Sequence, residues 1–237
     1  MQVREKKTKG FTLLELLVVI AIIGILSAAV YPNFSSWIKD RKVRQAAVRI
    51  KNLISNINTQ VQKGSYEFVQ VRFIEDGSVT VFTNGIGTAS LAFKKKDPDD
   101  AFNEKKTRCN INDSYWDVLG SDGGSPRGVG QFISDEIAIN FASETTAVCF
   151  SKDGSYYSNS GIESPLNICL RTNTVYKCSV KINGDPDMDL LLPCKNAKYI
   201  YRINWSRFGN VTMDKWVAMY NDSGEKCVLI DGNWIPQ

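Results

Sequence analysis

The 237-residue chain contains no histidine, and this absence removes most of the chemistry that would suggest an enzyme. Ser–His and Cys–His nucleophile pairs are excluded, and so are zinc sites that use a histidine ligand. No two cysteines have the Cys-x-x-Cys spacing, so the usual zinc and thioredoxin patterns are missing as well. We therefore expect a protein that is not an enzyme and that carries no cofactor or metal.

Charge and composition are not extreme either. The formal net charge is +4, which does not by itself indicate a nucleic-acid-binding protein. Hydrophobic residues make up 43% of the chain and aromatic residues 11%, enough to form a core. This composition predicts a folded protein of one or two units.

Six cysteines occupy the C-terminal three-fifths of the chain. We expect them to form disulfides in an oxidising compartment, with free buried thiols as the alternative. Six cysteines allow 15 pairings, and the sequence does not choose among them. The candidates are Cys109, Cys149, Cys169, Cys178, Cys194 and Cys227.

Phe11–Val30 is a run of twenty residues with a single charge. As a helix it measures about 30 Å, enough to cross the hydrocarbon core of a membrane. A secretory signal peptide is the alternative, with Ser27 and Ala29 as small residues at a cleavage site. Because the run exceeds a usual signal-peptide core and the helical pattern continues after it, we expect a transmembrane half over residues 11–31.

The helical pattern extends to residue 63, where Gly64 is a typical stop signal. A helix over residues 11–63 would be about 80 Å long. Its second half is amphipathic and should pack on a domain formed by residues 64–237. The apolar positions at helical spacing are Phe34, Trp37, Ile38, Ala46, Ala47, Ile50, Leu53, Ile54, Ile57 and Val61.

Glu15 is the one charged residue within the apolar run. A carboxylate at the centre of a membrane helix costs about 2.5–3.5 kcal/mol on insertion scales. Glu15 is four residues from Phe11, so one interpretation is that it favours its own helix N-terminus. The other is that its charge meets a cationic partner, such as a free amino terminus at Phe11 created by removing residues 1–10.

The segment Lys9-Gly-Phe-Thr-Leu-Leu-Glu-Leu16 resembles the prepilin peptidase site of type IV pilins and type II secretion pseudopilins. The resemblance implies that residues 1–10 are a leader, that the cut falls between Gly10 and Phe11, and that Phe11 is then N-methylated. It also implies that Glu15 is needed for methylation or for docking onto a neighbouring subunit. The expected partners are thus a prepilin peptidase and other pilin-like subunits.

The resemblance continues through Pro32 and includes two residues that loosen the helix in that family. These are Gly24 and Pro32. Proline lacks an amide hydrogen and clashes with the preceding turn, so we expect a kink or local melting at Pro32.

Membrane topology does not follow from charge, because both flanks of the apolar helix are basic. The resemblance and the distal cysteines place the N-terminus in the cytoplasm. Residues after about Tyr31 would then lie outside. We expect a single-pass inner-membrane protein with a periplasmic C-terminal domain, which later joins a filament at the cell surface.

Residues 64–237 contain short apolar runs separated by turn signals, which predicts an α+β fold with an antiparallel sheet packed on the long helix. Tyr66–Ile74 and Ser78–Thr83 should form a hairpin across Gly77. Asn183-Gly184 and Asp231-Gly232 are further turn signals. The other strand candidates are Ile133–Phe141, Thr146–Ser151, Leu166–Arg171, Val175–Ile182, Tyr199–Trp205, Val211–Ala218 and Lys226–Ile230.

Two of these pieces carry a second resemblance. Ala147–Gly154 and Ile203–Val211 are similar to strand–turn–strand pieces of H-type and FimT-like minor pseudopilins. Together with the large distal region, this favours a minor subunit over a major one.

Asp185, Asp187 and Asp189 have the spacing that opens a calcium-binding loop. Leu190 stands where an EF-hand has glycine, and Asn196 stands where the bidentate glutamate belongs. A solvated turn explains the three aspartates better.

DNA is a possible partner in the second functional hypothesis, a minor pilin that captures DNA for uptake. The motivation is the net positive charge together with aromatic residues that we expect to be exposed. A third hypothesis, a membrane-anchored enzyme, has no catalytic constellation to support it. The aromatic residues are Trp116, Trp205, Trp216 and Trp234.

Overall fold

A computed structural model describes the helical N-terminal part of the chain and most of its strands. The chain divides into two compact units, Met1–Lys39 and Asp40–Gln237, and each is considered by itself. The predicted leader, the Asn183-Gly184 turn and all of the Val175–Ile182 strand except Cys178 lie outside the described residues. The described residues are 11–86, 109, 127–140, 145–153, 156–159, 165–171, 178, 199–206, 210–222 and 227–237.

The long helix α1 covers Leu13–Gln62 and ends in a glycine cap. Gly64 has a φ of 77°, a left-handed conformation that glycine adopts without a steric penalty. The Gly64 N–H donates to the Val61 carbonyl at 2.9 Å, and the Ser65 N–H donates to the Gln60 carbonyl at 2.9 Å. These two bonds form a Schellman motif, so the predicted stop at Gly64 is confirmed.

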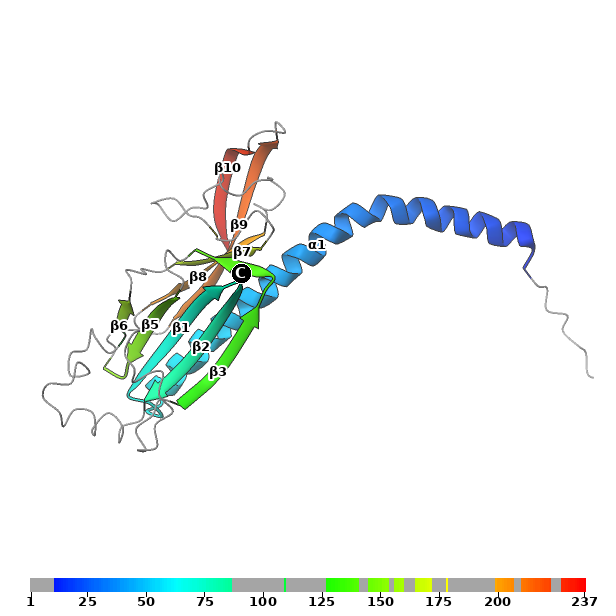
Figure 1. Ribbon diagram of the computed structural model, residues 1–237. Helices are drawn as coiled ribbons and strands as arrows, with labels where there is room; N and C mark the ends of the chain where they lie inside the picture. Colours follow the sequence, from blue (N-terminus) through cyan, green and yellow to red (C-terminus); the bar gives the residue numbers. More distant parts are fainter. Residues whose placement is uncertain are drawn as a thin grey trace, which may run out of the picture. The chain divides into compact units, whose positions relative to one another are not determined.

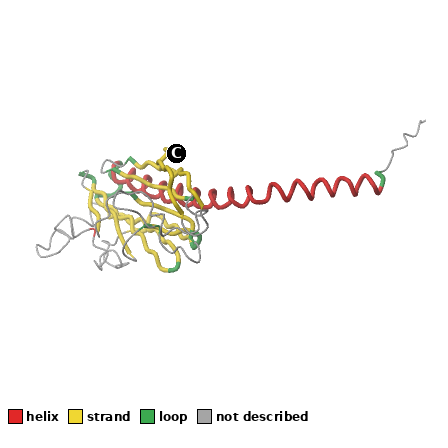
Figure 2. The backbone as a smooth tube through the Cα atoms, turned by 90° about the horizontal axis from the view of Figure 1, so that it is seen from above, coloured by secondary structure: helices red, strands yellow, loops and turns green. Residues whose placement is uncertain are grey.

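The C-terminal part of α1 packs on the strands that follow it, and Figure 2 shows it running alongside them. Its apolar residues recur every three or four positions, so they lie on one face and are buried together. The predicted positions from Ala46 to Val61 lie on this face, whereas Phe34 and Trp37, which the same predicted pattern included, are exposed. The buried helix residues are Val43, Ala46, Ala47, Ile50, Ile54, Ile57 and Val61.

In the part of the chain that the structure describes, ten strands form two five-stranded antiparallel sheets (Figure 1). The α+β fold class is confirmed, with two sheets where we expected one. The first sheet has the order β3-β2-β1-β5-β6, with β1 Phe68–Asp76, β2 Ser78–Ile86, β3 Arg127–Ser134, β5 Thr145–Ser151 and β6 Tyr156–Asn159. The second has the order β10-β9-β8-β7-β4, with β4 Ile137–Ile139, β7 Leu166–Leu170, β8 Ile200–Trp205, β9 Val211–Asp222 and β10 Cys227–Pro236.

The β1–β2 hairpin was predicted correctly. Asp76 pairs with Ser78, and Gly77 between them has a φ of 65°. Only glycine takes up this conformation readily, so the turn residue itself sets the register of the hairpin.

Two other sequence predictions were wrong. Ile133–Phe141 is not one strand, because the chain leaves the first sheet at Ser134 and enters the second at Ile137. The Asp231-Gly232 turn is also absent, since both residues lie inside β10, next to a register shift between Leu229 and Asp231.

A polar cluster ties α1 to the second sheet within the larger unit. The Tyr201 hydroxyl on β8 donates to Asp40 Oδ1 at 3.0 Å, and Lys215 Nζ on β9 lies 2.8 Å from the same oxygen. Burial, followed by the Asp40 carboxylate, raises the pKa of the Tyr201 phenol well above its usual value.

Candidate functional site

The first turn of α1 is closed by a reciprocal contact between Thr12 and Glu15. The Glu15 N–H donates to Thr12 Oγ1 at 3.2 Å. In return, Glu15 Oε2 accepts from the Thr12 N–H at 3.4 Å and lies 3.5 Å from Thr12 Oγ1. Since α1 begins at Leu13, Thr12 is the N-cap and Glu15 is the third helical residue, which makes this a capping box.

The capping box gives Glu15 a role within its own chain, because it stabilises the N-terminus of its own helix. This is one of the two interpretations drawn from the sequence. Its negative charge also lies in the first turn, where the helix dipole favours an anion. The pattern Thr-x-x-Glu before an apolar run is the sequence signal for this capping box, and the predictions from the sequence did not include it. The cap leaves the second interpretation open, because an ionised carboxylate has about four acceptor sites and the cap uses only Oε2.

The large side chains beside the cap and after it, from Phe11 to Leu26, are apolar apart from Glu15 and exposed on every side. The exposed fraction is 83% for Phe11, 59% for Leu16 and 56% for Ile23, and Val19 has the lowest value among the large apolar residues of this run at 45%. The Ser27 hydroxyl donates to the Ile23 carbonyl at 2.7 Å and so is satisfied within the helix. Exposed apolar surface of this extent is typical of a binding surface.

The two predicted helix-loosening residues both lie inside α1. A Cβ added to Gly24 would meet no atom within 4 Å, so this position is open. The helix continues through Pro32 without a break, and local melting at Pro32 does not occur in this structure. Within the described part of the chain, no helix has both the length and the hydropathy required of a membrane span.

Comparison with known proteins concerns this same N-terminal region. Residues 6–31 match the family model of the prokaryotic N-terminal methylation motif. This N-terminal segment is therefore similar to that of type IV pilin-like proteins.

Two curated relatives extend the similarity beyond the motif. A fimbrial protein of Moraxella nonliquefaciens is 36% identical over 83 residues, 35% of this chain and 53% of the relative. A fimbrial protein of Pseudomonas aeruginosa is 36% identical over 59 residues, 25% of this chain and 38% of the relative. The chain thus spans about half or less of the length of these relatives, and no solved structure matches it significantly.

Four of the six cysteines form disulfides in the described part of the chain. Cys109 is bonded to Cys149, and Cys169 is bonded to Cys178. Cys194 lies outside the described residues and the side chain of Cys227 is not described, so their pairing stays a prediction.

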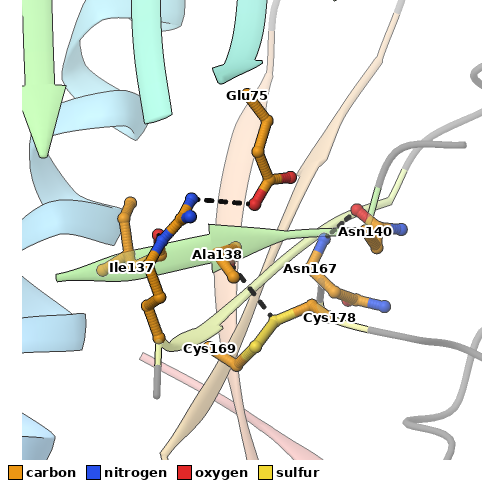
Figure 3. The surroundings of a disulfide bond; sticks show 8 residues. Glu75, Ile137, Ala138, Asn140, Asn167, Cys169 and Cys178 are labelled. Carbon is orange, nitrogen blue, oxygen red and sulfur yellow. Dashed lines mark hydrogen bonds and ion pairs between the residues drawn. A yellow bond between two sulfur atoms is a disulfide. The ribbon is translucent and has the colours of Figure 1, made fainter. Parts of the chain in front are cut away.

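The Cys169–Cys178 bond holds Cys178 against the short strand β4 (Figure 3). The Cys178 N–H donates to the Ile139 carbonyl at 3.1 Å. Cys178 Sγ also lies 3.3 Å from the Ala138 carbonyl, a contact without a shared hydrogen because the sulfur is in the disulfide. The bond therefore fastens the outer side of β4 to β7.

The expectation of exposed tryptophans was wrong for two residues. Trp205 and Trp216 are only 7% and 3% exposed. Trp205 is part of the hydrophobic core, whereas Trp216 is covered by Trp234 of the neighbouring strand, with ring centroids 5.1 Å apart. Trp205 stacks on Phe73 of the other sheet, with ring centroids 6.5 Å apart. Trp234 is half-buried, and the Cζ atom of Arg202 lies over its ring, 4.2 Å from the ring centroid. Trp116 lies outside the described residues.

The predicted calcium-like aspartates Asp185, Asp187 and Asp189 also lie outside the described residues. Among the residues that the structure does describe, no group of three or more His, Cys, Asp or Glu side chains could hold a metal ion.

Proposed function

We propose that this pilin-like chain is a minor pilin or pseudopilin, made as a precursor, processed at its N-terminus and assembled through α1 into a type IV pilus or a type II secretion pseudopilus. The observation that carries the proposal is the apolar surface of residues 11–27, which is exposed all round. Burying one such Leu or Ile side chain contributes about 1.5–3 kcal/mol, so a run of them requires lipid or neighbouring helices as a partner.

The precursor lies in the inner membrane, with its N-terminus in the cytoplasm and its C-terminal domain in the periplasm. The two disulfides of that domain support this orientation, because disulfides persist in oxidising compartments. From the membrane, the subunit moves into a filament at the cell surface.

Processing by prepilin peptidase supplies the charge that assembly uses. Hydrolysis of the Gly10–Phe11 bond leaves a free amine on Phe11, which is N-methylated and stays protonated at neutral pH. Glu15 of one subunit then neutralises the ammonium of its neighbour as both leave the lipid. The capping box supports this role, since it orients the carboxylate at the helix end with acceptor sites to spare.

The proposed role is structural rather than catalytic. Binding partners are other pilin-like subunits, and the large distal region with its two sheets suits a minor subunit. Capture of DNA has no specific support, because two of the tryptophans that motivated it are buried.

The experiment that tests the proposal is intact-mass analysis of the mature protein. We expect a chain that begins with N-methylated Phe11. Gly10→Leu should leave the precursor uncut in the membrane, because the residue before the scissile bond is replaced by a bulky one. A mature chain that begins near Val30 would instead indicate an ordinary signal peptidase and would refute the pilin interpretation.

A further inference from the structure

An exposed aromatic pair lies on α1 just beyond the apolar run. Phe34 and Trp37 are three residues apart, so they share one face of the helix. Their rings stack with centroids 5.8 Å apart and an interplanar angle of 27°. Even so, Phe34 remains 53% exposed and Trp37 52% exposed. The pair is therefore an apolar surface that is ordered by its own contact but still largely accessible.

The position of this pair along the helix matches the thickness of a membrane. No charged residue occurs from Leu16 to Ile38, 23 residues in all (38 − 16 + 1), and the next charge is Lys39. Measured from the start of α1 at Leu13, Phe34 and Trp37 lie about 32 and 36 Å along the axis. The hydrocarbon core is about 30 Å thick and the whole bilayer about 40–45 Å. With the capped end at one interface, the pair reaches the headgroup region of the other.

We propose that Phe34 and Trp37 form an interfacial anchor, which binds the boundary between phospholipid headgroups and acyl chains on the side opposite the leader. Tryptophan favours this boundary because its ring is apolar and its indole N–H is a hydrogen-bond donor. The exposed Lys39 follows and suits the lipid phosphates. The inference rests on the proposed membrane insertion and adds to it a lipid contact that sets the depth of the helix before assembly.

The anchor is testable by depth-dependent quenching of tryptophan fluorescence. The full chain is reconstituted at a low protein-to-lipid ratio in phosphatidylcholine–phosphatidylglycerol vesicles, with bromine on the acyl chains either near the headgroups or near the bilayer centre. The emission of Trp37 is the difference between the wild type and Trp37→Phe, a substitution that keeps an aromatic ring at this position. We expect this emission to be quenched most by bromine near the headgroups and least by bromine at the centre.

Trp234→Phe is the matched control, because Trp234 lies on β10 and is only half-buried. The emission of Trp234, taken as the difference between the wild type and Trp234→Phe, should be the same whether the bromine lies near the headgroups or near the bilayer centre. Flotation and carbonate extraction of the same samples report insertion separately. If the chain is inserted but the Trp37 emission is unquenched, or quenched most at the centre, the anchor is refuted while the proposed function stands. If the chain does not insert, the membrane step of the proposed function fails, and the anchor fails with it.

Discussion

The two halves of α1 carry similar apolar residues in opposite environments. Leu16 and Ile23 are more than half exposed, whereas Val43 and Ile50 are fully buried. In the second half the apolar residues form one stripe, and polar or charged residues occupy the remaining positions. In the first half they surround the helix. The helix is regular in both halves, so the pattern of apolar residues, and not the secondary structure, distinguishes a partner inside the chain from one outside it.

Replacing one isoleucine in each half of α1 should show the largest difference between the halves, measured as the change in the free energy of unfolding. Ile50→Ala removes a fully buried side chain and should lower the free energy of unfolding by about 2–5 kcal/mol. Ile23→Ala changes the same residue type on the same helix, but its side chain is exposed and should leave this free energy almost unchanged. Denaturant unfolding of the detergent-solubilised full chain, followed by near-ultraviolet circular dichroism, measures both. Equal effects would show that the two halves do not differ in their partners.

Both described disulfides lie in the larger unit, where the second half of α1 is packed. The two bonds should contribute different amounts to the free energy of unfolding. The Cys109–Cys149 bond closes a separation of 40 residues and the Cys169–Cys178 bond a separation of 9. On the chain-entropy model these loops correspond to about 4 and about 2.5 kcal/mol. Replacing each pair by alanine should therefore destabilise the protein more for the first pair. The reverse order in thermal or denaturant unfolding would show that native-state contacts outweigh loop length.

The smallest effect concerns the cluster that ties α1 to the second sheet. Tyr201 keeps its proton in the folded protein at a pH where an unfolded tyrosine, with a pKa of about 10, loses it. The unfolded state then binds fewer protons, so stability should fall as the pH rises above about 10.

Tyr201→Phe should remove this contribution to the pH dependence. It should also cost about 1 kcal/mol at neutral pH, for the lost hydrogen bond to Asp40. Denaturant unfolding at neutral and alkaline pH measures both effects. If the free energy of unfolding falls equally with pH above pH 10 in the wild type and in Tyr201→Phe, the raised pKa of Tyr201 does not contribute to stability.

Local signals in the sequence were enough to predict several elements. The buried stripe from Ala46 to Val61 follows helical spacing, and Gly64 and Gly77 each stand where the backbone needs a positive φ. The cap at Thr12 and Glu15 was equally local, and a search for Thr-x-x-Glu would have found it.

Other features depend on residues that are distant in the sequence. Gly232 looked like a turn residue, but the Trp216 indole of the neighbouring strand occupies the space beside it, and a Cβ there would lie 2.3 Å from the ring. The chain changes sheets between Ser134 and Ile137 without a proline or glycine to mark the break. The choice of disulfide partners is likewise set by the packing of the strands, so none of these could be read from local patterns.

The most direct test of the account is the recovery of a Glu15→Leu variant in sheared filaments, relative to its level in the membrane fraction. Thr12→Ala is the matched control, because it weakens the capping box but keeps the carboxylate. Leaving one partner of a buried charge pair unpaired costs about 3–5 kcal/mol, so Glu15→Leu should reduce incorporation about a hundredfold or more while membrane insertion is unchanged. Thr12→Ala should be incorporated nearly as well as the wild type. If Glu15→Leu enters filaments like the wild type, Glu15 serves only its own helix, and assembly by charge pairing is contradicted.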